Sequence, residues 1–198
     1  MAGIVRGEAR HSPARGFVGG YELEPPSLGL PFMAAFLNPG GWGRSFTTAL
    51  DAHESMAGMW IVGEDMPKET NRVTLSEVKD QWGLSVANVN FSDHASDIAT
   101  RSHAHARGEA ICKAVGATRV FPTPPYPSPH NPGTNRMSER PEDGVVNKYG
   151  QSHDIANLLV SDGSQFTTGA AETPALTIVA LAIRQVDYIA GQMTAQAI

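Results

Sequence analysis

The sequence has few of the features that mark several protein classes. Its 198 residues include a single cysteine, Cys112, which excludes an internal disulfide framework and favours a reducing compartment such as the cytoplasm. The formal net charge is -5, and the lysines and arginines are scattered along the chain. Because nucleic acids select clustered positive charge, we do not expect nucleic acid to be a partner.

Long apolar runs are also absent. No run approaches the roughly 20 residues that a membrane-spanning helix needs, and no segment has the basic start and apolar centre of a signal peptide. Hydrophobic residues make up 41% of the chain and charged residues 18%, as in ordinary globular proteins. We therefore expect a folded, soluble protein without a membrane span.

A third absence concerns phosphate binding. No GxGxxG pattern follows a predicted strand, and GGWGRSF at residues 40–46 has neither the third glycine nor a preceding strand. Such a turn holds the pyrophosphate of dinucleotide cofactors in Rossmann-like domains. The sequence therefore offers no phosphate-cradling loop of this kind.

The first 115 residues predict a sheet with helices. Residues 1–58 are rich in Gly and Pro, which predicts loops and short extended pieces. The β-prone runs NRVTL (71–75) and SVANVNF (85–91) flank a turn segment with Asp80 and Gly83, so we expect an antiparallel pair. An alanine-rich helix is predicted over residues 92–115, with acidic residues early and Lys113 late.

The second half predicts a different pattern. GVVN (144–147) and NLLVSD (157–162) are expected strands, and GSQFTTGAAE (163–172) an expected loop of small residues. A helix should run from Pro174 to about Ala190, with Thr173 as its N-cap. Apolar residues cover nearly all of its first three turns, which predicts burial on most sides.

A proline-rich segment precedes a histidine that is a candidate for catalysis. FPTPPYPSPHNP, residues 121–132, holds six prolines in twelve residues and includes His130. We expect a stiff strut that positions His130, although such a segment can also be a ligand for a polyproline-binding domain. His103 and His105 point about 200° apart on a helix, so they predict surface residues and no metal site.

Several motifs together resemble a known family. HNPGTNRM, DGVVN, NLLVSDGSQF and ETPALTIVALAIRQVDYIA occur in the order and at the spacings of the C-terminal region of the glucose-methanol-choline (GMC) flavoprotein oxidoreductases. GEDMPKETNRVTL and VKDQWGLSV resemble the substrate domain of bacterial members. The resemblance covers roughly residues 60–192. It implies a mixed α/β fold in two parts, with an antiparallel-sheet substrate domain and covering helices in residues 1–120. Residues 121–198 would add the C-terminal strand and buried helix of a Rossmann-like, FAD-binding lobe.

The resemblance also implies a site and a reaction. The enzyme would oxidise a CH–OH group of an alcohol, sugar or polyol by hydride transfer to FAD, with His130 as the base and Thr173 at the second catalytic position. An imidazole can take the hydroxyl proton near neutral pH, and a helix N-terminus stabilises the negative charge of reduced flavin. The implied FAD-binding residues are Asn131, Gly133, Thr134, Asp162, Gly163, Pro174, Ala175 and Thr177.

The sequence departs from the family at two positions and in its extent. Thr173 stands where the family has His or Asn, and Asn135 stands where Cys or a small residue is common. The N-terminal FAD-binding half is not in the sequence, so the chain resembles a C-terminal fragment whose partner is that missing half. Two hypotheses follow: part of an FAD-dependent dehydrogenase or oxidase, or a non-catalytic remnant or substrate-binding module without redox activity.

Overall fold

The computed structural model describes residues 5–6, 13–25, 42–125, 128 and 130–197. It divides into two compact units, and each combines two stretches of the chain. One unit comprises residues 1–63 and 96–127, and the other comprises residues 64–95 and 128–198. Helices and small antiparallel sheets occur in both, so the predicted mixed α/β class is confirmed. The predicted functional division near residue 120 concerns the lobes of a whole enzyme and stays a prediction.

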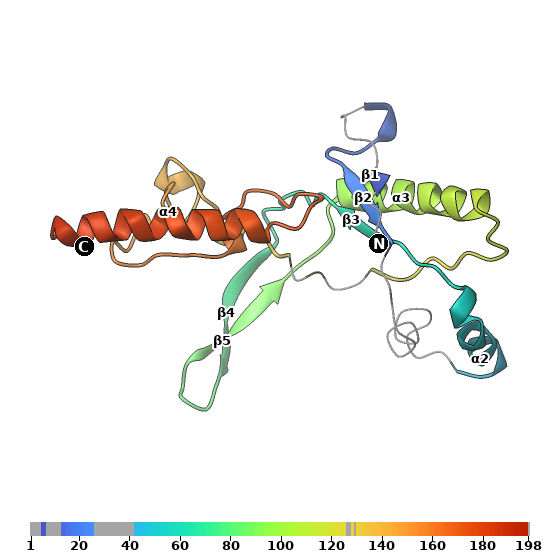
Figure 1. The fold of residues 1–198 in the computed structure, drawn as a ribbon. Coiled ribbons are helices and arrows are strands. Elements are labelled where there is room, and N and C mark those ends of the chain that lie inside the picture. The colour runs from blue at the N-terminus through green and yellow to red at the C-terminus, as the bar shows by residue number, and fades with distance from the viewer. Residues whose placement is uncertain (1–4, 7–12, 26–41, 126–127, 129, 198) are drawn as a thin grey trace. The chain divides into compact units, whose positions relative to one another are not determined.

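The first unit is built on a three-stranded antiparallel sheet. Its strands β1 (Val5–Arg6), β2 (Tyr21–Glu24) and β3 (Trp60–Gly63) lie in the order β1-β2-β3, with Leu23 opposite Ile61. The predicted alanine-rich helix is α3 (Ala95–Ala114). Ala104 of α3 is fully buried in a cluster with Phe17, Tyr21 and Leu23, because its small side chain lets the helix approach these larger residues. The predicted covering helix is therefore confirmed for this sheet (Figure 1).

Two expectations about this unit are wrong. Residues 1–58 were expected to form loops and short extended pieces, but α2 (Arg44–Asp51) and the short 3₁₀ helices η1 (Pro13–Arg15) and η2 (His53–Ser55) lie there. The Thr47 hydroxyl donates to the Arg44 carbonyl inside α2, a local bond that composition does not reveal. His103 and His105 are both half-buried rather than on the surface. The Nδ1 of His103 lies 3.0 Å from the Tyr21 hydroxyl, and its ring packs edge-on against Phe17.

The second unit contains the predicted hairpin. Strands β4 (Arg72–Lys79) and β5 (Ser85–Asn90) pair antiparallel and form a projecting two-stranded ribbon (Figure 1). The Asp80 carboxylate accepts hydrogen bonds from the backbone N–H groups of Trp82 and Leu84, at 2.8 and 2.9 Å, which fixes the turn. Gly83 supplies the left-handed conformation there, with φ of 81°. The predicted antiparallel pair and its turn are confirmed.

The predicted C-terminal helix is confirmed as α4 (Ala175–Thr194), but two details are wrong. Its N-cap is Pro174 and not Thr173, and the cap makes no side-chain hydrogen bond. The helix is also buried on one side only. Leu176, Val179, Ile183 and Val186 are 83%, 54%, 60% and 62% exposed, because the loops of this unit cover only the opposite side, around Gln185. Among the described residues, no helix has the length and apolar character to cross a membrane.

The expected strands at residues 144–147 and 157–162 are also a correction. Isolated bridges form there instead: Val146 pairs with Met137 and with Ser152, and Leu159 pairs with Gln151. The Asn147 carboxamide oxygen accepts from the backbone N–H groups of Tyr149 and Gln151, and these local bonds compete with a strand ladder. The predicted loop after residue 162 begins with the 3₁₀ helix η4 (Gly163–Gln165), and a similar turn, η3 (Pro141–Asp143), lies upstream.

Candidate active site

The HNPGTNRM loop lies against the Asp-Gly turn that was expected near the cofactor. The backbone N–H groups of Gly133 and Asn135 both donate to the Ser164 carbonyl, at 3.1 Å each. The Met137 N–H donates to the Gln165 carbonyl at 2.8 Å. Three backbone bonds therefore hold two segments that lie about 30 residues apart in the sequence.

Hydrogen bonds between side chains strengthen the same junction. The Asp162 carboxylate oxygen Oδ1 accepts from the backbone N–H of Ser164 at 2.8 Å and also from the Ser164 hydroxyl. The Ser164 hydroxyl oxygen lies 3.0 Å from Asn135 Nδ2, which donates to it. Asn135, Ser164 and Asp162 thus form a continuous polar contact between the loop and the turn.

Two glycines fit this junction, one through close packing and the other through its backbone conformation. A Cβ on Gly163 would lie 3.3 Å from Cδ1 of Ile178, so the turn packs directly against the first turns of α4. Gly133 has φ of 92°, a left-handed conformation that side chains rarely adopt. A Cβ there would lie 3.7 Å from the Phe166 carbonyl. Gly163 of the Asp-Gly motif therefore lets the turn pack on α4, and Gly133 of the HNPGT motif supplies a left-handed backbone conformation.

Some predicted site residues meet at this junction, whereas the side chains of others make no described hydrogen bond there. Gly133, Asp162 and Gly163 meet at the junction, and α4 contacts it through Ile178. His130 is half-buried, and its backbone N–H donates to the Ser128 hydroxyl at 3.1 Å. The hydrogen bonds of the described residues include none from the side chains of His130 or Thr173. A direct pairing of these two residues therefore stays a prediction.

The remaining predicted residues lie mostly on the surface. Asn131, Thr134, Thr173, Ala175 and Thr177 are exposed, whereas Pro174 is half-buried at the start of α4. Exposure leaves their backbone and side-chain groups accessible to a ligand.

Two buried glutamine side chains hydrogen-bond to backbone carbonyls near the junction. Gln185 of α4 is 6% exposed, and its Nε2 donates to the carbonyls of Tyr149 and Val160, at 3.0 and 2.8 Å. Gln165 is 5% exposed, and its Nε2 donates to the Asp162 carbonyl at 3.3 Å. Buried amides need such partners because an unpaired polar group is costly in the interior. Gln185 therefore holds the chain at Tyr149 and Val160 against α4, and Gln165 closes the turn on its own first residue.

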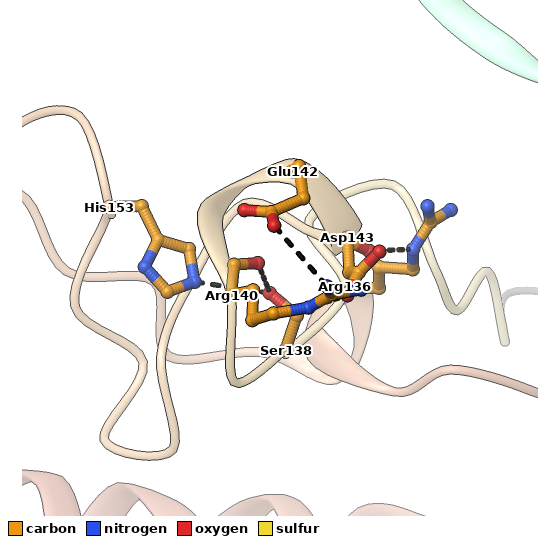
Figure 2. Close-up of polar contacts among 6 residues, drawn as sticks. All are labelled: Arg136, Ser138, Arg140, Glu142, Asp143 and His153. Carbon is orange, nitrogen blue, oxygen red and sulfur yellow. Dashed lines mark hydrogen bonds and ion pairs between the residues drawn. The ribbon is translucent and has the colours of Figure 1, made fainter.

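A second polar network fixes the loop downstream of the candidate site, as Figure 2 shows. The Ser138 hydroxyl donates to the Arg140 carbonyl at 2.7 Å, so it accepts from Nε2 of His153, 3.1 Å away. Arg136 Nε donates to the Asp143 carbonyl at 2.7 Å, and Arg140 pairs with the carboxylate of Asp143. These bonds close the loop that follows the HNPGTNRM motif.

Sequence reasoning missed the residues that hold the candidate site. Ser164, Gln165 and Gln185 were not singled out, and Asn135 was noted only as a departure from the family. One local signal was present for Ser164, because an Asp side chain commonly bonds the backbone two residues on. No local signal exists for Gln185, which lies in the middle of a helix and bonds to residues 25 and 36 positions away.

Comparison with known proteins now identifies the family. The family model described as GMC oxidoreductase matches residues 67–182, more than half of the chain, and this range includes both the HNPGTN loop and the first turns of α4. The chain belongs to the GMC oxidoreductase family. The resemblance noted from the sequence motifs is thereby confirmed.

Individual GMC relatives agree with this assignment. The chain is 40% identical to 2-methyl-1,2-propanediol dehydrogenase of Mycolicibacterium austroafricanum, over 91% of this chain and 34% of that protein. It is 31% identical to the fructose dehydrogenase large subunit of Gluconobacter japonicus, over 66% of this chain and 24% of that protein. It is 25% identical to the gluconate 2-dehydrogenase flavoprotein of Pantoea cypripedii, over 86% of this chain and 30% of that protein. The chain thus spans about a third or less of these relatives' lengths.

Proposed function

We propose that this chain forms part of an FAD-dependent oxidoreductase that oxidises a CH–OH group, with His130 as the base that takes the hydroxyl proton. The observation that carries the proposal is the junction of the HNPGTN loop, the Asp162–Gly163 turn and the start of α4. It gathers elements from three separate motifs that the sequence assigned to one site. Family membership supplies the reaction class.

The geometry at the start of α4 fits a flavin. The helix begins at Ala175 without a side-chain cap, so no N-cap side chain of its own accepts from its first N–H groups. Those groups and the positive end of the helix dipole suit an anionic ring edge. Gly163 brings the turn close to the same end of the helix. We propose that Asp162, Gly163, Pro174, Ala175 and Thr177 hold the ring, with Asn131, Gly133 and Thr134 on the loop side.

The protein side of the chemistry is a proton transfer. Oxidation of an alcohol breaks an O–H bond and a C–H bond, and the products are a carbonyl and a reduced acceptor. A bound flavin would accept the hydride from carbon. His130 accepts the hydroxyl proton at its imidazole nitrogen, which raises the electron density on oxygen as the C–H bond breaks. Thr173 has a hydroxyl that can donate to the substrate oxygen but cannot act as a base near neutral pH.

The names of the relatives support a substrate class. Their names give a propanediol, fructose and gluconate as substrates, and each of these compounds carries hydroxyl groups. We infer that a small alcohol, polyol or sugar is the substrate here. The partner of this chain would be the flavin-binding part that its longer relatives possess.

One observation favours a second candidate function. Thr173 replaces the His or Asn that the family resemblance places beside the first catalytic histidine, and its side chain makes no described hydrogen bond. A substrate-binding module without redox activity would tolerate this change. The two candidates differ in whether the assembled protein reduces flavin at all.

A chimera tests the proposal. In it, this chain replaces the segment of 2-methyl-1,2-propanediol dehydrogenase that it matches, and stopped-flow absorbance follows flavin reduction by the diol and by a panel of sugars. We expect reduction with at least one substrate. His130→Ala should slow it by ~10²-fold or more, the usual scale for loss of a positioned base, while the flavin stays bound.

His105→Ala is the matched control, because this half-buried histidine lies on α3 outside the candidate site. It should leave the rate unchanged. A yellow chimera that reacts with no alcohol would support the binding module instead. Equal rates for His130→Ala and the parent would remove the histidine from the mechanism.

A further inference from the structure

The hydroxyl of Ser164 occupies a central place between the two loops of the candidate site. It contacts Asn135 on one side and Asp162 on the other. The same residue's carbonyl accepts the N–H groups of Gly133 and Asn135. Ser164 is therefore bonded to the HNPGTN loop through both its backbone and its side chain.

The hydrogen-bond directions in this cluster are fixed by chemistry. A carboxylate is only an acceptor, so the single hydroxyl proton of Ser164 points to Asp162. The hydroxyl oxygen then accepts from the amide nitrogen of Asn135. Each group uses the role that its neighbours require, and charge on the carboxylate strengthens the bond it accepts.

This cluster lies a short way along the chain from His130. The backbone bond of Gly133 is three residues after His130, and between them the ring of Pro132 lies beside Gly169, where a Cβ would be 3.6 Å away. Proline restricts the backbone of this connection. The backbone between the residues bonded to Ser164 and His130 is therefore short and restricted.

We propose that Ser164 is a positioning residue for His130, acting through Asn135 and Asp162 to set the place of the HNPGTN loop. The inference rests on the proposed role of His130 as the base. Loss of the hydroxyl keeps the backbone donors and acceptor but removes the side-chain contacts to Asn135 and Asp162, so the backbone bonds open more often. The loop then samples positions from which the histidine transfers the proton less well, since small misplacements of catalytic groups cost large factors in rate.

Hydrogen exchange tests the structural half of the inference without activity. In the 198-residue chain, Ser164→Ala should raise the amide exchange rates of Gly133 and Asn135 on the order of tenfold relative to the parent. Ser164→Thr keeps a hydroxyl and should restore protection. Ser161→Ala is the matched control, because Ser161 is an exposed serine of the same segment with no described hydrogen bond. Unchanged exchange in Ser164→Ala would overturn the inference.

A double-mutant cycle in the holoenzyme, formed with the flavin-binding part, tests the functional half. Ser164→Ala should lower the limiting rate of flavin reduction by about tenfold and leave the substrate Kd within about twofold. In the His130→Ala background the same change should cost less than about twofold, because residues that act through one another are not additive.

The outcomes separate the two levels of the hypothesis. If His130→Ala is silent, the proposed function fails, whatever Ser164→Ala does. If His130→Ala is slow but the Ser164→Ala effect is the same in both backgrounds, Ser164 acts only on general stability and the positioning role is wrong.

Discussion

At Gly150, substitution tests how closely the loops pack beneath the candidate site. Gly150 is buried with φ of 72°, and a Cβ there would lie 2.3 Å from Gln185 Nε2 and 2.6 Å from the Val160 carbonyl. Gly150→Ala should therefore lower the free energy of unfolding by roughly 2 to 4 kcal/mol, from backbone strain and overpacking. Urea denaturation measures it.

The matched control is Gly191→Ala in the same unit. Gly191 lies in α4, and a Cβ there meets nothing within 4 Å. Alanine is the better helix former, so this variant should gain about 0.5 to 1 kcal/mol. Equal effects of the two substitutions would show that the loops do not pack on Gln185 as described.

Thr173 gives a second residue-scale prediction, one that concerns rate. Because its hydroxyl does not cap α4, Thr173→Ala should change the free energy of unfolding by less than about 0.5 kcal/mol. In the holoenzyme it should lower flavin reduction modestly. Thr173→Asn restores a family residue that can hydrogen-bond the substrate oxygen, so the reduction rate should hold or rise.

Stopped-flow reduction and thermal unfolding of both variants check this assignment. Loss of all activity in Thr173→Ala, together with a silent His130→Ala, would reverse the roles proposed for the two residues.

At the scale of elements, α4 presents an exposed apolar stripe. Leu176, Val179, Ile183, Val186 and Met193 are all exposed and recur at intervals of three, four or seven residues on one side of the helix. A shallow groove on this side is lined by Val179, Ala182, Ile183, Val186 and Asp187 and contains no predicted site residue. Apolar patches of this kind drive association.

We expect the isolated chain to associate through this stripe. Val179→Gln with Ile183→Gln should shift the population toward monomer in size-exclusion chromatography with light scattering, while circular dichroism keeps its helical signal. Thr177→Gln places the same side chain beside the stripe and should leave association unchanged. Association that persists in the double variant would point to the apolar face of the β4–β5 hairpin instead.

Elements with local signals could be predicted, and those set by distant contacts could not. The hairpin was readable because Asp80 and Gly83 mark its turn, and α3 and α4 were readable from their composition and length. α2 was not predicted because the Gly-rich composition of the surrounding sequence indicated loops. The strands expected after residue 144 reduce to single bridges, because Asn147 bonds the backbone locally.

In the candidate site, too, some residues could be predicted from the sequence and others could not. The family resemblance predicted that His130, Asp162 and Gly163 share one site, and the backbone bonds from Gly133 to Ser164 bring the loop and the turn together. The place of His130 in that site stays a prediction. The supports were not readable, because Gln185 and Asn135 act through partners far away in the sequence. A polar residue in a helix pattern does not reveal which carbonyls it will meet.

At the scale of the whole molecule, the described residues present two exposed apolar surfaces that suit a larger assembly, and the sequence lacks one feature of dinucleotide binding. The α4 stripe is exposed, one face of the β4–β5 hairpin carries exposed Val73, Leu75 and Val89, and the sequence has no phosphate-cradling glycine loop. A two-stranded hairpin is at best marginally stable alone. The matched part of this chain covers only 34%, 24% and 30% of three of its family relatives. We infer that the flavin-binding part of the enzyme covers these surfaces.

Flavin binding tests this inference directly. The purified 198-residue chain should bind FAD weakly or not at all, because the pyrophosphate finds no glycine-rich turn and isolated ring contacts provide too little affinity. The chimera with the flavin-binding part of the Mycolicibacterium relative should instead carry flavin. Visible absorbance after gel filtration measures both, and the ratio of flavin to protein in the eluted protein peak gives the stoichiometry. A stoichiometric yellow chain on its own would show that these 198 residues bind FAD without a glycine-rich phosphate loop, and it would overturn the need for a partner.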